Sequence, residues 1–102
     1  MKTAEPMTHW PFPEPPDSAA VTTSYVTDDR MPIVHVSRDL DEDGETTWQF
    51  HAEPDFSMSA ARLVRLATIV ALDPTVLELA SLPLGATAIR ASLHAPWVVR
   101  TA

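Results

Sequence analysis

The sequence lacks several residue types on which common protein functions depend. None of its 102 residues is cysteine, which excludes disulfides, thiolate zinc sites, iron–sulfur clusters and cysteine nucleophiles. It has only two glycines, too few for a phosphate-binding loop, a dinucleotide-binding turn or the serine elbow of hydrolases. Its apolar runs are far shorter than the ~18 residues of a membrane span. No apolar segment follows Met1 and Lys2 as in a secretory signal, so we expect a soluble, cytoplasmic protein that does not bind membranes.

Basic residues are also scarce. The chain has 14 aspartates and glutamates against 7 lysines and arginines, which gives a formal net charge of −7. A surface of this sign repels phosphate backbones, so DNA and RNA are not expected partners. A chain of this length forms one small domain, and its limited core favours the burial of further surface in a complex or a homodimer.

Prolines concentrate at the beginning of the chain. Half of the ten lie within the first 16 residues, where each removes a backbone donor and favours extended geometry in the residue before it. We therefore predict a proline-rich arm over residues 1–20 and a single domain over residues 21–102. Trp10 and Phe12 lie between these prolines. The sequence leaves open whether the arm is a loose tail or a strap whose two rings dock onto the domain.

The first half of the domain has the pattern of a β-sheet that is packed on one side. Residues 21–26 are rich in β-branched and aromatic side chains, which predicts a strand. Residues 33–37 and 46–51 predict an antiparallel hairpin around a polar turn over residues 39–45. The register that we predict gathers apolar side chains on one face. It pairs Arg38 with Thr46, Val36 with Trp48, and Val34 with Phe50, and leaves His35, Gln49 and His51 on the other face.

The second half of the domain predicts one or two helices over residues 59–80. Leu63, Leu66, Ala67 and Val70 have helical spacing, although the segment is apolar on nearly all sides. A competing interpretation makes residues 63–66 a short strand and begins the helix near Ala67. Asp73 and Pro74 are typical of the start of a second short helix. Residues 86–92 then predict a strand, and residues 96–99 a terminal edge strand.

These elements together predict an α+β fold. We expect an antiparallel sheet of about four to five strands, with one or two helices packed on one face. Trp48, Phe50 and Trp97 are expected to belong to the core.

The polar turn of the hairpin carries the most distinctive local motif. Asp39-x-Asp41-x-Asp43-Gly44 matches the first half of a calcium-binding loop, but Phe50 stands where such a loop has its bidentate glutamate. We interpret the segment as a solvated acidic turn. Residues 1–55 hold 12 acids and 3 bases, whereas residues 56–102 hold 2 acids and 4 bases.

This imbalance predicts an acidic face that attracts a basic protein partner, because complementary charge raises the encounter rate and orients the partner. No base interrupts the run of acids between residues 39 and 55. The predicted partner-binding residues are Asp39, Asp41, Glu42, Asp43, Glu45, Glu53 and Asp55.

Histidines offer a second, weaker possibility for a site. In the predicted register, His35 and His51 lie diagonally to one another on neighbouring strands, but with Gln49 they form an incomplete zinc set. We predict no metal site, no cofactor and no catalytic residues, since acid–base catalysis requires a buried carboxylate and the acids here cluster in a turn that is exposed to water.

Five segments of the chain carry a resemblance to a known group of proteins. They are Pro32-Ile33-x-x-Val36, Asp41-x-Asp43-Gly44, Trp48-Gln49-Phe50, Ile69-x-x-Leu72-Asp73-Pro74-Thr75-Val76 and Leu82-Pro83-Leu84-Gly85-x-x-Ala88-x-Arg90. Together they resemble a group of small bacterial domains of unknown function that is related to immunity proteins of polymorphic toxin systems. The resemblance covers residues 21–97 and implies an α+β fold without a catalytic signature. Arg65 stands where a small capping residue is expected in that group, which argues against a helix that begins at Leu66.

The sequence therefore predicts a non-catalytic protein-binding domain, with an immunity-type inhibitor of a toxin as its specific form. The alternative is a small metal- or ligand-binding module that uses the Asp39–Asp43 turn or the His35 and His51 pair.

Overall fold

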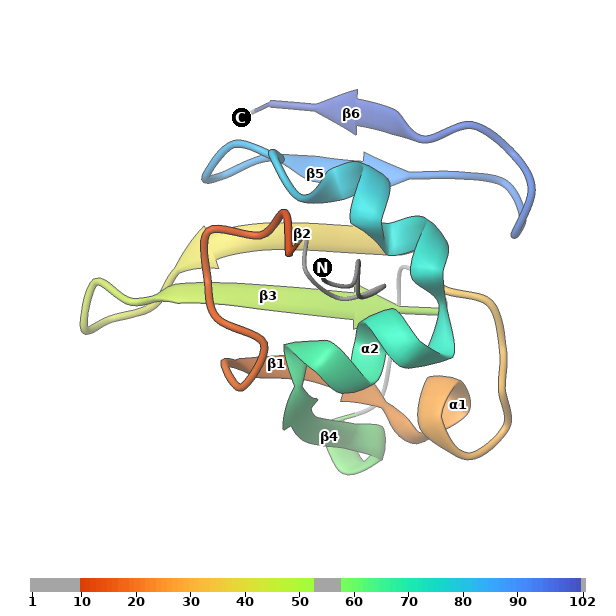
Figure 1. Cartoon of the computed structure of the whole chain (residues 1–102). Helices are drawn as coiled ribbons and strands as arrows, with labels where there is room; N and C mark the ends of the chain where they lie inside the picture. The colour runs from red at the N-terminus through yellow and green to blue at the C-terminus, as the bar shows by residue number, and fades with distance from the viewer. Residues whose placement is uncertain (1–9, 53–57, 102) are drawn as a thin grey trace, which may run out of the picture.

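The computed structural model describes residues 10–52 and 58–101, which form an α+β fold (Figure 1). The elements in chain order are β1 (Ala19–Thr23), α1 (Ser24–Thr27), β2 (His35–Leu40), β3 (Thr46–His51), the 3₁₀ turn η1 (Met58–Ala60), β4 (Ala61–Arg65), α2 (Leu66–Leu72), the 3₁₀ helix η2 (Pro74–Leu79), β5 (Thr87–Ile89) and β6 (Val98–Arg100).

The strands form one mixed sheet in the order β4-β1-β3-β2-β5-β6. β1 and β3 run parallel, and every other neighbouring pair is antiparallel. The prediction of an α+β fold is confirmed, but the expected antiparallel sheet of four to five strands is wrong in strand number and in direction. The connection through α1 places β2 on the far side of β3, so β1 meets β3 directly. Local alternation of side chains does not specify such a pairing.

The β2–β3 hairpin buries the predicted face in a different register. Val36, Trp48 and Phe50 are each at most 1% exposed, which confirms that they line the dry side. However, Val36 pairs with Phe50 and Arg38 pairs with Trp48, a shift of two residues from the predicted register. Val34 lies before β2 and is only half-buried.

A short turn explains this shift. Pairing continues to Leu40 and Thr46, beyond the predicted last pair. The N–H of Asp41 donates to the carbonyl of Glu45 at 2.8 Å, and the N–H of Gly44 donates to the carbonyl of Asp41 at 3.0 Å. Gly44 has a φ of 82°, a conformation that glycine adopts without steric cost.

Residues 21–26 form a strand only in their first half. β1 ends at Thr23, and α1 follows as a single turn in which the N–H groups of Asp28 and Asp29 donate to the carbonyl of Ser24. This turn directs Val26 into the core, where it is buried. The β-branched composition here reflects burial, which a turn provides as well as a strand does.

The segment 61–72 follows the competing interpretation of the sequence. Ala61–Arg65 form β4 at one edge of the sheet, and α2 begins at Leu66. The prediction of a continuous helix that begins near residue 60 is therefore wrong. Leu63, expected on the buried stripe of that helix, instead pairs with Val21 and is 73% exposed.

The first turn of α2 is capped by the proline-rich arm. Arg65 occupies the cap position, and its side chain makes no capping hydrogen bond. Instead, the N–H of Leu66 donates to the carbonyl of Ser18 at 2.8 Å, and the N–H of Ala67 donates to the carbonyl of Pro16 at 2.9 Å. These carbonyls satisfy donors that every helix start leaves unpaired. The expectation that Arg65 disfavours a helix start at Leu66 is thus wrong.

Asp73 and Pro74 begin the second helical segment, as predicted. The carboxylate of Asp73 accepts a hydrogen bond from the N–H of Thr75 at 3.0 Å, and Pro74 is the first residue of η2. β5 is shorter than the predicted strand over residues 86–92, whereas β6 confirms the predicted terminal edge strand.

The described part of the arm, residues 10–18, crosses in front of the sheet beside α2 and η2 (Figure 1). Phe12 is buried, and its ring meets Trp48 edge-on at 5.2 Å between centroids. This segment is therefore a strap and not a loose tail, and it completes the core together with α2 and η2. In the described ranges, no helix has the length and apolar composition that a membrane crossing requires.

Candidate functional site

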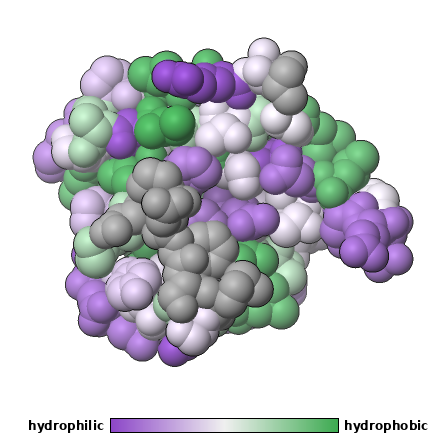
Figure 2. All heavy atoms as spheres, turned by 180° about the vertical axis from the view of Figure 1, so that it is seen from behind, coloured by the Kyte–Doolittle hydropathy of each residue, from purple (hydrophilic) through white to green (hydrophobic). Residues whose placement is uncertain are grey.

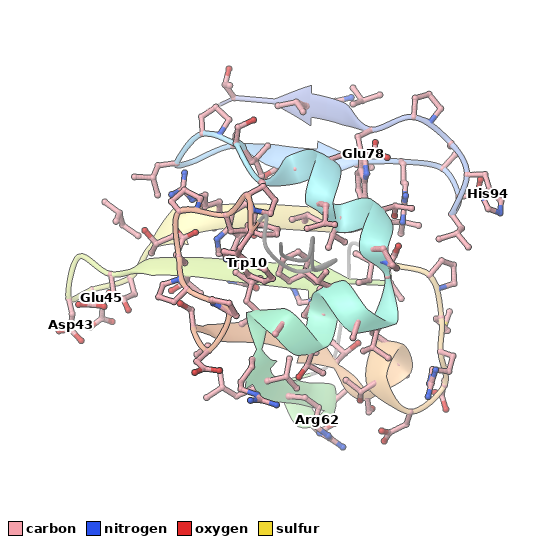
Figure 3. The ribbon with its side chains drawn as sticks, viewed as in Figure 1. Trp10, Asp43, Glu45, Arg62, Glu78 and His94 are labelled. Atoms are coloured by element: carbon pink, nitrogen blue, oxygen red, sulfur yellow. The ribbon has the colours of Figure 1, made fainter. Side chains whose placement is uncertain are left out.

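The structure describes five of the seven predicted partner-binding residues, and all five lie at the end of the β2–β3 hairpin. One is at the end of β2, and four belong to the exposed turn that projects from the molecule (Figure 3). Glu53 and Asp55 lie outside the described residues. The five are Asp39, Asp41, Glu42, Asp43 and Glu45.

One aspartate fixes the shape of this turn. The Oδ1 atom of Asp41 accepts hydrogen bonds from the N–H groups of Asp43 and Glu45 at 2.8 and 2.9 Å. This local bonding is the common role of aspartate in tight turns. Among the residues that the structure describes, no group of three or more acidic or histidine side chains is placed to hold a metal ion. The hydrogen bonds of Asp41 show what this part of the calcium-loop pattern does here, which is to close a turn.

The carboxylates of the turn form no ion pair among residues 10–52 and 58–101. The ion pairs there use other acids, namely Glu14, Asp17 and Asp73. Seen from behind, the turn is a hydrophilic projection at one side of the molecule (Figure 2). Unpaired charges of one sign at a projecting turn produce a local negative field that attracts basic groups.

A groove of about 610 Å³ runs beside the acidic turn. Asp41 and Glu45 supply its acidic wall, and Val21 of β1 and Leu63 of β4, which are paired across the two strands, supply its apolar wall. The groove thus combines carboxylates with an exposed apolar side chain. Its lining residues are Glu14, Pro15, Ser18, Ala19, Val21, Asp41, Glu45, Thr46, Thr47 and Leu63.

Glu14 of the strap anchors the inner end of this groove. Its Oε1 atom accepts a hydrogen bond from the indole Nε1 of Trp48 at 2.9 Å, and its Oε2 atom pairs with Arg38 at 3.0 Å. Arg38 also donates to the carbonyl of Leu82 at 2.9 Å. Burial raises the pKa of Glu14, but the hydrogen bonds from Trp48 and Arg38 outweigh it and leave this pKa below its ordinary value. Sequence analysis missed Glu14, since its only signal is an acid among prolines.

The histidine pair lies on the sheet face that is opposite to the helices. His35 and His51 occupy paired positions of β2 and β3, with ring centroids 6.2 Å apart, and the predicted diagonal placement is replaced by a direct one. The Nε2 atom of His51 is hydrogen-bonded to the side chain of Gln49 at 3.0 Å. His51 is buried, and this burial, with the charge of His35, lowers the pKa of His51.

These histidine contacts predict that stability falls as the pH is lowered from about 7.5 to about 5.5. In the unfolded chain, His51 has its ordinary pKa of about 6.5, whereas in the folded chain its pKa is lower. The unfolded chain therefore binds the proton more readily, and protonation favours unfolding as the pH falls below about 6.5. Urea unfolding at a series of pH values measures the effect. A second fall is expected below about pH 4.5, where the unfolded chain protonates Glu14 and the folded chain does not.

His51→Gln is the variant that tests this pH dependence, and His94→Gln is its control, because His94 is exposed. The first variant should flatten the stability profile between about pH 7.5 and about pH 5.5, and the second should leave it unchanged. If the pH dependence of stability is the same in His51→Gln as in the parent chain, then His51 is not its cause.

A buried ion pair lies at the opposite end of the sheet, and sequence analysis missed it. The guanidinium of Arg90 donates to Asp73 Oδ2 at 2.8 Å, to Thr75 Oγ1 at 3.0 Å and to the carbonyl of Ile33 at 2.9 Å. It also lies over the ring of Trp97, 4.1 Å from the centroid. Arg90 follows β5 directly. Its contacts link the end of this strand to the start of η2, to the α1–β2 connection and to the β5–β6 connection, so the network holds the helical layer on the sheet.

No family model matches the chain, and no match is found among the curated proteins or the solved structures. The functional argument therefore rests on the groove, the charges and the cavities described by the structure.

Proposed function

We propose that this chain is a non-catalytic protein-binding domain whose groove beside the acidic turn receives a basic and partly apolar segment of a partner protein. One observation carries the proposal. The groove brings together Asp41 and Glu45, which have no ion-pair partner among the described residues, and Leu63, which has the largest exposed fraction of the large apolar side chains described.

The negative charge of the groove favours a partner segment that carries positive charge. A lysine or arginine of the partner would meet carboxylates that form no ion pair among the described residues, so no internal ion pair has to break first. Electrostatic attraction of this kind raises the association rate and orients the partner. A negative surface equally disfavours nucleic acid, which supports a protein as the partner.

The apolar wall supplies the contact that excludes water. Leu63 pairs with Val21 across β4 and β1, so the two apolar side chains lie side by side on one face of the sheet. Burying exposed apolar area yields roughly 25 cal/mol per Å², and central apolar contacts commonly dominate binding energy. A partner segment that alternates basic and apolar residues would engage both walls.

A selection from a random displayed-peptide library against the immobilised chain tests the proposal. We expect enriched peptides that combine lysine or arginine with apolar residues. Their affinity should fall about tenfold when Glu42→Gln, Asp43→Asn and Glu45→Gln are combined, because three attractive charges are removed. Leu63→Ser should weaken binding about five- to tenfold. Titration calorimetry at two salt concentrations measures both effects.

Matched controls separate the groove from general charge. Asp28→Asn, Asp29→Asn and Glu78→Gln together remove the same number of charges from exposed positions that lie outside both the acidic turn and the groove. Leu84→Ser removes an exposed leucine elsewhere. Both controls should bind the selected peptides as the parent chain does. Peptides that bind all variants equally, or a selection without basic peptides, would contradict the proposal.

The finer proposal is an immunity-type inhibitor that neutralises a toxin. It is supported by the resemblance of the motifs in residues 21–97 to immunity proteins of polymorphic toxin systems, and by a groove suited to a basic surface. A toxin gene beside the gene for this chain would supply the partner. Binding of that toxin should weaken with salt and with Leu63→Ser, and inhibition of its activity should weaken in parallel.

A further inference from the structure

A second cavity lies at the end of the molecule opposite to the acidic turn. It has a volume of about 320 Å³ and opens between the α1–β2 connection, the start of η2 and the β5–β6 connection. His94, one of its rim residues, and Asp43 of the turn are labelled at opposite ends in Figure 3. A volume of this size is within the range of small-molecule sites in proteins, about 300–1,000 Å³.

The body of this cavity is apolar. Val26 and Ile33 are buried side chains of its lining, Leu72 is half-buried, and Met31 and Leu93 are exposed. Two prolines, Pro32 and Pro74, complete the apolar lining. Such a surface favours a ligand with a hydrocarbon or aromatic body.

The acidic and hydroxyl groups of the lining are already occupied. Asp73 Oδ1 accepts from the N–H and the hydroxyl of Thr75 at 3.0 and 2.5 Å, and Asp73 Oδ2 accepts from Arg90 at 2.8 Å. The hydroxyl of Thr75 also accepts from Arg90 at 3.0 Å. The charge of the buried carboxylate is thus matched by a buried guanidinium, and the carboxylate is not left to bind a cationic ligand.

The remaining polar side chains of the lining are basic or able to become so. Arg30 and His94 make no side-chain hydrogen bond or ion pair with any residue that the structure describes. Asp28 and Asp29, which precede Arg30, do not line the cavity. An arginine without a partner at the rim of an apolar cavity offers a two-pronged donor to a carboxylate.

The backbone at Arg30 is held in a conformation that L-residues rarely adopt. Its φ is 56°, and it is the one described residue other than glycine with a positive φ. The turn around it is closed by the N–H of Met31, which donates to the carbonyl of Tyr25 at 3.0 Å. Such strain persists where surrounding contacts impose it, and it concentrates at ligand-binding positions.

We propose that this cavity binds a small amphipathic carboxylate, with the carboxylate on Arg30 and the apolar body against Leu72 and Ile33. His94 adds a second donor at the rim. The ligand is a monocarboxylic acid with an aliphatic or aromatic body, since the lining is largely apolar and Arg30 is its one side chain with a permanent positive charge and no partner among the described residues. This site does not overlap the groove beside the acidic turn, so it stands or falls independently of the protein-binding function.

Amide NMR spectra of the full chain, titrated with sodium octanoate, test the site. We expect saturable shifts that centre on residues 30–33, 72–75 and 93–94. Acetate has the charge without the apolar body and should give no saturable shifts. Octylammonium has the same body with the opposite charge and should bind at least about tenfold more weakly than octanoate.

Variants at Arg30 assign the carboxylate contact. Arg30→Gln should weaken octanoate about tenfold, since a hydrogen-bonded charge is lost, and should leave octanamide binding unchanged. Arg30→Gly removes the same charge while glycine accepts the positive φ, so it tests the contact in a chain whose fold is preserved. Arg62→Gln, an exposed arginine outside the cavity, should have no effect.

Three results would overturn the proposal. They are equal binding of octanoate and octylammonium, shifts that centre outside the lining, and full octanoate affinity in both Arg30 variants.

Discussion

Replacing Arg90 with methionine is expected to destabilise the chain by about 3–5 kcal/mol, because it leaves the carboxylate of Asp73 buried without its partner. The two side chains are 2% and 9% exposed, so water cannot replace the lost contact. The substitution also removes the donor to the Ile33 carbonyl and the stacking on Trp97. Since small domains have a total stability of about 5–15 kcal/mol, this is a large fraction of the whole. Urea or thermal unfolding measures it.

A double variant separates the unpaired charge from the other losses. Asp73→Asn keeps a side-chain oxygen to accept the N–H of Thr75, so the double variant Asp73→Asn/Arg90→Met should be more stable than Arg90→Met alone. Arg62→Met is the control, since Arg62 is exposed and bonds only to nearby carbonyls of its own segment. It should change stability by less than about 0.5 kcal/mol. If Arg90→Met is as mild as this control, the buried pair is not a stabilising part of the fold.

Replacing Phe12 with alanine is the second large effect, with an expected loss of about 3–5 kcal/mol. Phe12 is 4% exposed and contacts two indole rings, Trp10 at 5.4 Å and Trp48 at 5.2 Å between centroids. Its removal would leave a cavity in the core and weaken the strap that carries Glu14. Guanidinium unfolding, followed by tryptophan fluorescence, measures the loss.

An exposed aromatic residue provides the control for Phe12. Tyr25 in α1 is 39% exposed, and Tyr25→Ala should cost less than about 1 kcal/mol. Glu14→Gln keeps the shape of the strap but removes the negative charge that pairs with Arg38. Its loss of stability should therefore lie between the losses of Tyr25→Ala and Phe12→Ala. Equal stability of Phe12→Ala and the parent chain would show that the strap contributes nothing to the core.

The strap also explains why the helical layer begins where it does. The carbonyls of Pro16 and Ser18 receive the first N–H groups of α2, and Glu14 receives the indole N–H of Trp48. The proline-rich segment therefore caps the start of α2 and contributes Phe12 to the hydrophobic core. β1 begins at Ala19, two residues before the predicted start of the domain, so strap and sheet are continuous.

The sequence was sufficient where the physical signal is local. Alternation placed Val36, Trp48 and Phe50 on one face of a hairpin, and the run of acids with Gly44 placed an exposed turn between its strands. The pair Asp73-Pro74 placed a helix start. In each case, neighbours within a few residues determine the geometry through side-chain period, fixed φ or a capping oxygen.

The remaining features needed contacts between residues far apart in the chain. The parallel pairing of β1 with β3 depends on which strands meet, and the same contacts decide between the strand β4 and the continuous helix that the local pattern left as alternatives. Leu63 is apolar yet exposed because β4 forms an edge, which turns a predicted core residue into a wall of the groove. Arg90 and Glu14 read as ordinary surface charges in the sequence. Only the tertiary structure buries Arg90 and half-buries Glu14, because each finds hydrogen-bond partners more than a dozen residues away.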